Sequence, residues 1–160
     1  MHFIQAIIAF FGRAFIAIIF IASGLHKILA WTGSESFFTT TATELLSHSV
    51  GQPLVQQGLE WALDNVFPLL VAATAVEIVC GLLIFLGLWV RLASLILFLY
   101  LIPTTLLFHH FWLLQSPDSD VQIVQFLKNI AIMGGLLNLL AYGRGGASRR
   151  SEKKPMEKAA

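Results

Sequence analysis

The chain has 160 residues, of which 57% are hydrophobic and 12% are charged, and its mean hydropathy is +0.79. A water-soluble domain of this size could not bury so much apolar surface, so the composition excludes a soluble globular protein. The net charge is only +1, and no groove pattern of basic and aromatic residues occurs, so no nucleic-acid partner is indicated. We expect one membrane domain, with the lipid bilayer as its main partner.

Four long apolar runs follow one another, at about residues 3–29, 66–90, 92–114 and 121–142. Each exceeds the roughly 20 residues that a helix needs to cross the hydrocarbon layer. They predict an all-α polytopic membrane protein, a four-transmembrane-helix bundle over residues 1–143 with a long outer first loop. The first run could instead be a secretory signal, because Arg13 precedes an apolar stretch. We favour a membrane helix, since residues 3–11 before Arg13 are themselves apolar.

Two segments lie outside these runs. Residues 30–65 form the first loop, in which 35–48 and 53–65 mix apolar and polar residues and are predicted to be short amphipathic helices that cap the outer face. Residues 144–160 are rich in Ser, Gly, Lys and Glu and have too few apolar residues for a core. We expect a disordered basic cytoplasmic tail there.

Basic residues are unevenly distributed between the loops. The tail carries six Lys and Arg residues, and the link between the second and third runs carries Arg91. The first and third loops contain acidic residues and no Lys or Arg. The positive-inside rule therefore places both termini in the cytoplasm. The aromatic residues agree with this orientation, because Trp and Tyr prefer the two membrane interfaces. Trp31 and Trp112 fall at the outer ends of the runs, and Trp89 and Tyr142 fall at the inner ends.

Arg13, Glu77 and Lys128 stand inside apolar runs. A charge at that depth is unfavourable unless it is paired or functional. At about 1.5 Å per residue, Arg13 and Glu77 both lie near the middle of the membrane. We expect an intramembrane ion pair between them, which would fix the register of two helices or take part directly in chemistry.

A second group of polar side chains gathers toward the outer side, beneath the first loop. There we predict a ligand site formed by Lys128, His109, Lys27, Asn129, Gln125 and His26. Lys27 and His26 could instead extend toward the headgroups from the end of the first helix. About 100° separates the adjacent His109 and His110 on a helix, so at most one can face the interior, and we favour His109.

Motifs for other chemistry are missing from the sequence. Ligation of haem or a metal by His26 with His109 is a weak alternative without a ligand motif, and we predict no metal site. Cys80 is the only cysteine, so the chain cannot run a dithiol–disulfide cycle alone. A phosphate-binding glycine loop, a His-Glu-x-x-His pair and a Gly-x-Ser-x-Gly elbow are all missing. Whether the protein is an enzyme therefore stays open.

Several short strings are spread over about residues 11–143. The main ones are Gly12-Arg13, Ser23-Gly24-Leu25 with Lys27, Val76-Glu77, Arg91-Leu92-Ala93, Phe126-Leu127-Lys128-Asn129 and Met133-Gly134-Gly135. Together these strings resemble the DoxX family of small bacterial membrane proteins. The stretch from His109 to Trp112 also looks like the family's His-x-Phe-Trp sequence.

The resemblance implies a four-helix fold in the bacterial inner membrane and a quinone-related role. The family takes its name from a subunit associated with a thiosulfate:quinone oxidoreductase, and other members are linked to redox stress. No redox cofactor is evident in the chain, and the resemblance implies a quinone as the cofactor. The electrons would then have to come from a redox partner protein. The family's recurring polar residues correspond to Arg13, Lys27, Glu77, Arg91, His109, Lys128 and Asn129.

The leading hypothesis is a quinone-linked redox accessory or subunit. An apolar slot between helices would accept the quinone, and Lys128, His109 or Lys27 would donate hydrogen bonds to its carbonyl oxygens. The alternative is a non-enzymatic lipid-binding, assembly or structural subunit whose polar interior recognises a head group or a partner's helix. A homo-oligomer is left open.

The charge distribution makes a prediction about topology. A reporter that is active only in the periplasm should stay silent when fused after Ala160, because the basic tail is expected in the cytoplasm. A cysteine introduced at Ser47 should react with a membrane-impermeant reagent added from outside, measured in intact cells. The reverse pattern in both assays would contradict the orientation.

Overall fold

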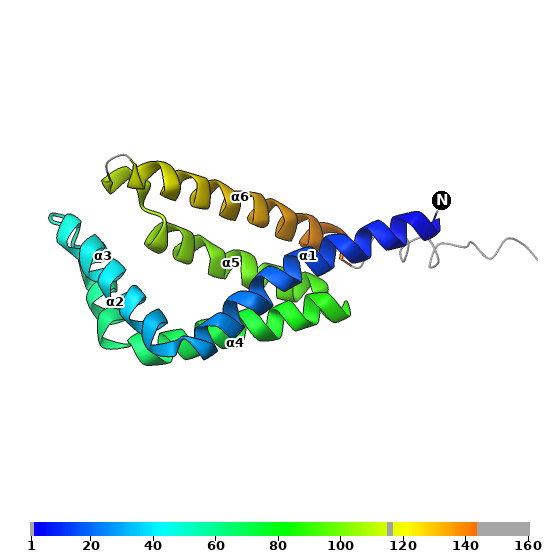
Figure 1. Cartoon of the computed structure of the whole chain (residues 1–160), viewed down its shortest axis with the longest axis horizontal. Coiled ribbons are helices and arrows are strands. Elements are labelled where there is room, and N and C mark those ends of the chain that lie inside the picture. Colours follow the sequence, from blue (N-terminus) through cyan, green and yellow to red (C-terminus); the bar gives the residue numbers. More distant parts are fainter. Residues whose placement is uncertain (1, 115–116, 144–160) are drawn as a thin grey trace, which may run out of the picture.

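The protein is seen here as a computed structural model that describes residues 2–114 and 117–143 (Figure 1). No strand occurs in these two ranges, and four stretches are long and apolar enough to cross a membrane, which confirms the predicted all-α fold with four transmembrane helices. The predicted tail, 144–160, lies outside the described residues. The helices are α1 (His2–Leu29), α2 (Trp31–His48), α3 (Pro53–Asp64), α4 (Val66–Leu86), α5 (Val90–Phe108), the short 3-10 helix η1 (Phe111–Leu113) and α6 (Asp118–Tyr142).

Close packing of α1 against α4 depends on small residues in both helices. A Cβ atom on Gly24 would lie 2.5 Å from Cγ1 of Ile78. A Cβ atom on Gly81 would lie 2.8 Å from Cγ1 of Ile21 and 3.3 Å from the carbonyl oxygen of Ala17. Glycine therefore lets the two backbones approach, as small residues commonly do between membrane helices.

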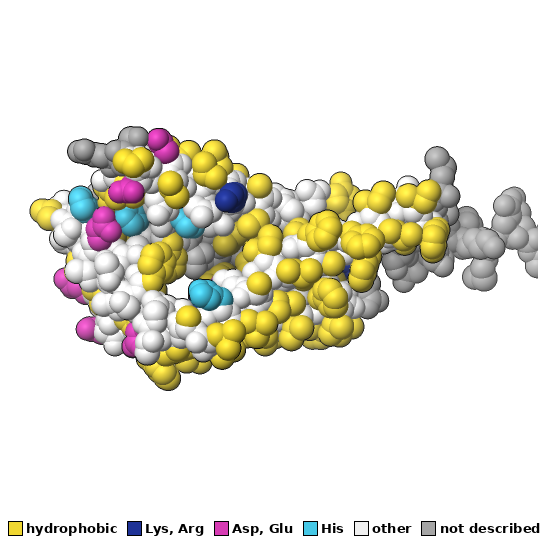
Figure 2. Space-filling model, in the orientation of Figure 1, with side chains coloured by type: hydrophobic (Ala, Val, Ile, Leu, Met, Phe, Trp, Pro, Cys, Tyr) yellow, Lys and Arg dark blue, Asp and Glu magenta, His cyan; other side chains and the backbone are white. Residues whose placement is uncertain are grey.

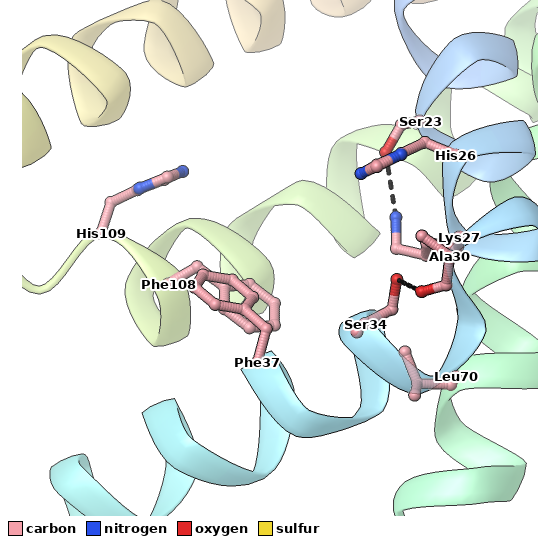
Figure 3. Close-up of a pocket in the computed structure, with 10 residues that line it drawn as sticks. Ser23, His26, Lys27, Ala30, Ser34, Phe37, Leu70, Phe108 and His109 are labelled. Atoms are coloured by element: carbon pink, nitrogen blue, oxygen red, sulfur yellow. Dashed lines mark hydrogen bonds between the residues drawn. The ribbon is translucent and has the colours of Figure 1, made fainter.

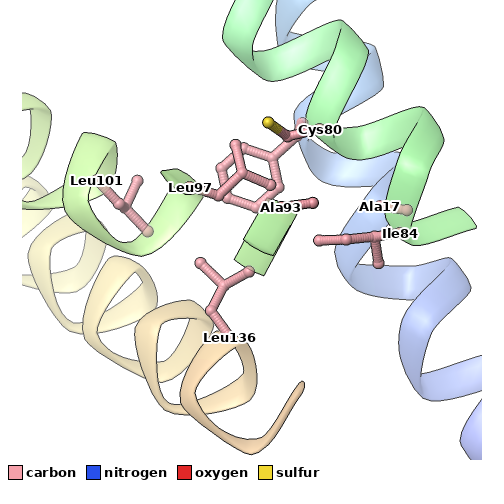
Figure 4. Packing of buried hydrophobic residues seen from close by; sticks show 8 residues of the cluster. Ala17, Cys80, Ile84, Ala93, Leu97, Leu101 and Leu136 are labelled. Atoms are coloured by element: carbon pink, nitrogen blue, oxygen red, sulfur yellow. The ribbon is translucent and has the colours of Figure 1, made fainter. Parts of the chain in front are cut away.

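The main core lies where α1 packs on α4, α4 on α5 and α5 on α6 (Figure 4). Gly87, in a left-handed conformation with φ of 71°, ends α4. The N–H of Leu88 donates to the carbonyl of Leu83 at 2.8 Å, so α4 stops with the hydrogen-bond pattern of a tight glycine cap. The buried residues of this core are Ala17, Phe20, Cys80, Ile84, Ala93, Leu97, Leu101 and Leu136.

The first loop is helical, as predicted, and consists of α2 and α3. Helix α2 begins at Trp31 rather than at 35, directly after α1 ends. The hairpin buries Phe38, Ala42 and Leu59 against one end of the bundle, where Phe108 of α5 also packs. Figure 2 shows acidic side chains at this end and an apolar surface over most of the remainder. The location of this end outside the membrane stays a prediction.

The α-helix in the third apolar run ends earlier than predicted, although the candidate membrane span continues to Leu113. Helix α5 stops at Phe108 and not at 114, and His109 follows with φ of −127° and ψ of 51°, outside the helical region. The chain then forms η1, whose Phe111 and Trp112 rings pack on Phe126 of α6, with centroids 5.3 and 6.5 Å away. Aromatic packing on α6 thus accompanies the change of direction after α5.

The α1–α4 packing makes a prediction about stability. Gly81→Val should lower the free energy of unfolding by about 1–3 kcal/mol, because the new side chain must displace Ile21 and press on the α1 backbone. Gly134→Val is the matched control, since a Cβ atom at Gly134 would meet nothing within 4 Å. Thermal unfolding in detergent measures both. Equal losses for the two variants would show that close approach at Gly81 is not required.

Candidate functional site

An ion pair between α1 and α4 lies at the centre of the candidate site. Nζ of Lys27 lies 2.7 Å from both Oε1 and Oε2 of Glu77. The Glu77 side chain is 5% exposed and that of Lys27 is 19% exposed. Such a pair is strongly favoured over either charge alone inside a membrane domain, because each charge compensates the other.

Two further side chains complete the cluster around Glu77. Ser23, one turn before Lys27 on α1, accepts a hydrogen bond from Nζ at 2.9 Å and donates to Oε1 of Glu77 at 3.2 Å. The hydroxyl of Tyr100 on α5 donates to the same Oε1 at 2.8 Å. Three helices therefore meet at one carboxylate, and we call Ser23, Lys27, Glu77 and Tyr100 the Glu77 cluster.

The expected ion pair between Arg13 and Glu77 is wrong, because Glu77 pairs with Lys27. Contacts between Gly24 and Ile78 place Glu77 level with the Ser23 part of α1. Ten residues separate Ser23 from Arg13, which is about 15 Å along a helix. Arg13 lies closer to the level at which α4 ends, and its buried Nε has no hydrogen-bond partner among the described residues.

Three adjoining cavities surround the Glu77 cluster. The polar chamber has a volume of about 220 Å³ and is lined by Glu77, Lys27 and Tyr100 together with Thr104, His109 and Asn129. The apolar cavity, about 340 Å³, lies between α3, α4 and α5 and is lined mainly by Ala, Val, Leu, Phe and Pro side chains. Lys27, Tyr100, Thr104 and Phe108 line both of these. The two spaces are therefore neighbours that share one wall.

The third space, which we call the outer cavity, is the largest, at about 540 Å³. Figure 3 shows His109 pointing into it from the end of α5, opposite Ser23, His26 and Lys27 on α1. Phe37 of α2 stacks on Phe108 at its edge, with ring centroids 5.3 Å apart and an interplanar angle of 15°. His109 lines the outer cavity and the polar chamber, so it lies between the two.

Helix α6 contributes polar groups that orient this wall. Nδ1 of His109 lies 2.8 Å from Oε1 of Gln122. Nδ2 of Asn129 donates to Oγ1 of Thr105 at 3.0 Å, and Thr105 in turn donates to the carbonyl of Leu101 at 2.6 Å. His109 and Asn129 are therefore held in place by partners outside the chamber that they line.

Not all of the predicted ligand residues come together. Lys27, His109 and Asn129 line the polar chamber, and His26 lines the outer cavity. Lys128 and Gln125 are exposed on α6, where Nζ of Lys128 donates to Oε1 of Gln125 at 3.3 Å, and neither lines any of the three cavities. Ile132 of α6 also lines the polar chamber and Gly135 faces Ile16 of α1, whereas Lys128 and Gln125 lie on the exposed side of the helix.

Of the two adjacent histidines, His109 lines the polar chamber and the outer cavity, although the argument that favoured it does not apply. That prediction assumed a continuous helix, but α5 ends before His109. His110 is 4% exposed, and its Nδ1 lies 2.8 Å from the carbonyl oxygen of Leu107. Its Nε2 lies 3.9 Å from Oε2 of Glu44 on α2. His109 thus lies at the cavities, while His110 faces the α2–α3 hairpin.

Some residues of the site were not predicted from the sequence. Tyr100 and Thr104 lie one turn apart on α5, and both line the chamber. Ser23 lies four residues before Lys27, a spacing that brings two side chains together on a helix and could have indicated it. Arg91, which the resemblance singled out, lies away from the cavities and donates to the carbonyl of Ala141 near the end of α6 at 3.2 Å. Within the described residues, no group of three or more His, Cys, Asp or Glu side chains could hold a metal.

Four membrane-length helices around a buried ion pair define a multi-pass helical membrane protein. The family model of DoxX matches residues 8–110, and the chain belongs to the DoxX family. It is 25% identical over 146 residues to inner membrane protein YphA of Escherichia coli (strain K12), a match that covers 90% of this chain and 89% of YphA. No solved structure matches.

The corrected pairing makes a prediction for a double-mutant cycle. Glu77→Ala should cost about 3–5 kcal/mol of stability, because it leaves Lys27 largely buried without its counterion. The double variant Glu77→Ala with Lys27→Met should lose less stability than the sum of the two single losses. For Glu77→Ala with Arg13→Met, the two losses of stability should be additive. Unfolding in detergent measures all five variants. The pairing would be contradicted if the stability losses at Glu77 and Lys27 were additive, or if those at Glu77 and Arg13 were not.

Proposed function

We propose that this protein is a quinone-linked redox accessory of the inner membrane that binds a quinone between its helices. One observation carries the proposal: the polar chamber and the apolar cavity share the wall formed by Lys27, Tyr100, Thr104 and Phe108. A quinone has a compact polar ring and a long apolar tail, so its two parts match the two spaces. Ligand sites commonly combine a largely apolar lining with a few fixed polar groups in this way.

The location of the site supports a ligand that dissolves in the membrane. The apolar cavity is lined by residues of α4, which is the second membrane-length helix, and of α5. These residues include Ala72 and Ala73 of α4 and Pro103 and Leu107 of α5. A ligand that partitions into lipid would reach these helices without crossing water. The name of YphA, an inner membrane protein, and the quinone-related role implied for the family are in keeping with this environment.

The accessory role follows from the chemistry of the side chains. The Glu77 cluster forms part of the wall of the polar chamber, but its carboxylate, amine and hydroxyl groups do not carry electrons. Electrons for quinone reduction would therefore come from a redox partner. The competing function is that of a lipid-binding or assembly subunit, which extraction of the native ligand would distinguish. Mass spectrometry of the purified full-length protein should find a prenylated quinone rather than a phospholipid as the enriched small molecule.

Filling the apolar cavity tests this function. Ala73→Phe should weaken binding of a decyl-substituted benzoquinone about 5- to 150-fold, the equivalent of about 1–3 kcal/mol of overpacking, because the new ring occupies the space of the tail. Ala75→Phe is the matched control on the exposed face of the same helix and should bind normally. Binding to protein in lipid nanodiscs provides the measurement. Equal affinity of the two variants, or no quinone binding by the wild type, would contradict the proposal.

A further inference from the structure

The donors of the Glu77 cluster are already used within the protein. A lysine ammonium has three N–H donors. Those of Lys27 are directed at Oε1 and Oε2 of Glu77 and at Oγ of Ser23, with distances of 2.7, 2.7 and 2.9 Å. The hydroxyl hydrogens of Ser23 and Tyr100 are directed at Glu77 as well. The cluster therefore has no donor left for the carbonyl oxygens of a quinone.

The remaining groups of the polar chamber are mainly acceptors. Oε1 of Gln122 can only accept, so Nδ1 of His109 carries the proton of the neutral ring and Nε2 keeps a lone pair. Within the described residues, Nε2 of His109 and Oδ1 of Asn129 have no hydrogen-bond partner. The hydroxyl of Thr104 donates to the carbonyl of Tyr100 at 3.0 Å, which leaves its oxygen as a further acceptor. The second N–H of Asn129 is the donor that stays open beside these acceptors.

We propose that the polar chamber selects the reduced form of its ligand, a hydroquinone, over the oxidised quinone. This inference rests on the proposed function and specifies its ligand. A hydroquinone carries two hydroxyl groups that can donate to Nε2 of His109 and to Oδ1 of Asn129, whereas a quinone carries only acceptors. Facing the same lone pairs, a quinone would cover them without pairing them, which is unfavourable.

The charge of the chamber favours the same ligand. The Lys27 and Glu77 charges compensate each other at 2.7 Å, and no other Asp, Glu, Lys or Arg side chain lines the chamber. A neutral head group can therefore bind in the chamber without adding a charge that has no counterion there. Selection of the reduced form also raises the midpoint potential of the bound couple, by about 30 mV for each tenfold difference in affinity in a two-electron couple.

The test compares two redox forms of one probe on the full-length protein in lipid nanodiscs, at neutral pH and without oxygen. The probes are decyl-substituted benzoquinone, its dithionite-reduced hydroquinone, and the dimethyl ether of that hydroquinone, which keeps the shape but has no donors. We expect the hydroquinone to bind about 5- to 25-fold more tightly than the other two, with about fivefold for each of one or two hydrogen bonds.

A substitution at His109 tests whether this side chain causes the preference for hydroquinone. His109→Phe keeps an aromatic ring but removes the acceptor, so the affinity for hydroquinone should fall about fivefold while that for quinone stays unchanged. His48→Phe, at an exposed histidine at the end of α2, is the matched control and should keep the preference.

The possible results distinguish failure of the preference for hydroquinone from failure of the proposed quinone-binding function. Equal binding of the three probes, or tighter binding of the quinone, would overturn the selection of the reduced form and leave the proposed function standing. Failure of every probe to bind would overturn both. If decanol competed as well as the hydroquinone, the chamber would recognise any lipid hydroxyl, and the hydroquinone assignment would be wrong. The wild-type comparison decides these points even if His109→Phe does not fold.

Discussion

The buried ion pair of Lys27 with Glu77 is the constraint on which the arrangement of the helices depends. Neither charge is tolerated alone in an apolar surrounding, so α1 must hold Lys27 at the level of Glu77 on α4. Gly24 lies between Ser23 and Lys27 and brings the α1 backbone against Ile78 of α4, which shortens the distance that the Lys27 side chain has to bridge. Polar pairing and close packing therefore set the same register.

The ion pair also explains why the cavities lie at one end of the molecule. Beyond Glu77 in one direction, the helices close on an apolar core that extends to the tight turn at Gly87. In the other direction, α2 and α3 cover the end of α4 and α5, and Phe37 stacks on Phe108 there. Polar groups that point away from the core thus face partly open cavities beside the α2–α3 hairpin. The site is a consequence of how the bundle ends.

The sequence predicted the membrane spans and the helical first loop because both depend on local composition and periodicity. It misplaced the ion pair because depth was counted from helix ends, whereas α1 continues past the end of α4, with Phe3, Ile4 and Ile8 exposed. Register between helices is a tertiary property that no single segment encodes. The exposed positions of Lys128 and Gln125 and the end of α5 at Phe108 could not be predicted for the same reason, because both depend on how α5, η1 and α6 pack together.

The positions of the cations bear on which head group the molecule can hold. A phosphate needs a cation with donors to spare, and Lys27 has none, because its charge and its three N–H groups are already matched by Glu77 and Ser23. Arg13, whose Nε is buried without a partner, lies about 15 Å along α1 from Ser23, on the other side of the apolar core. An anionic lipid could therefore meet an available guanidinium only away from the polar chamber. This separation of charge supports the proposed ligand, a neutral ring with a long apolar tail, whose two parts match the two spaces on either side of Lys27 and Tyr100.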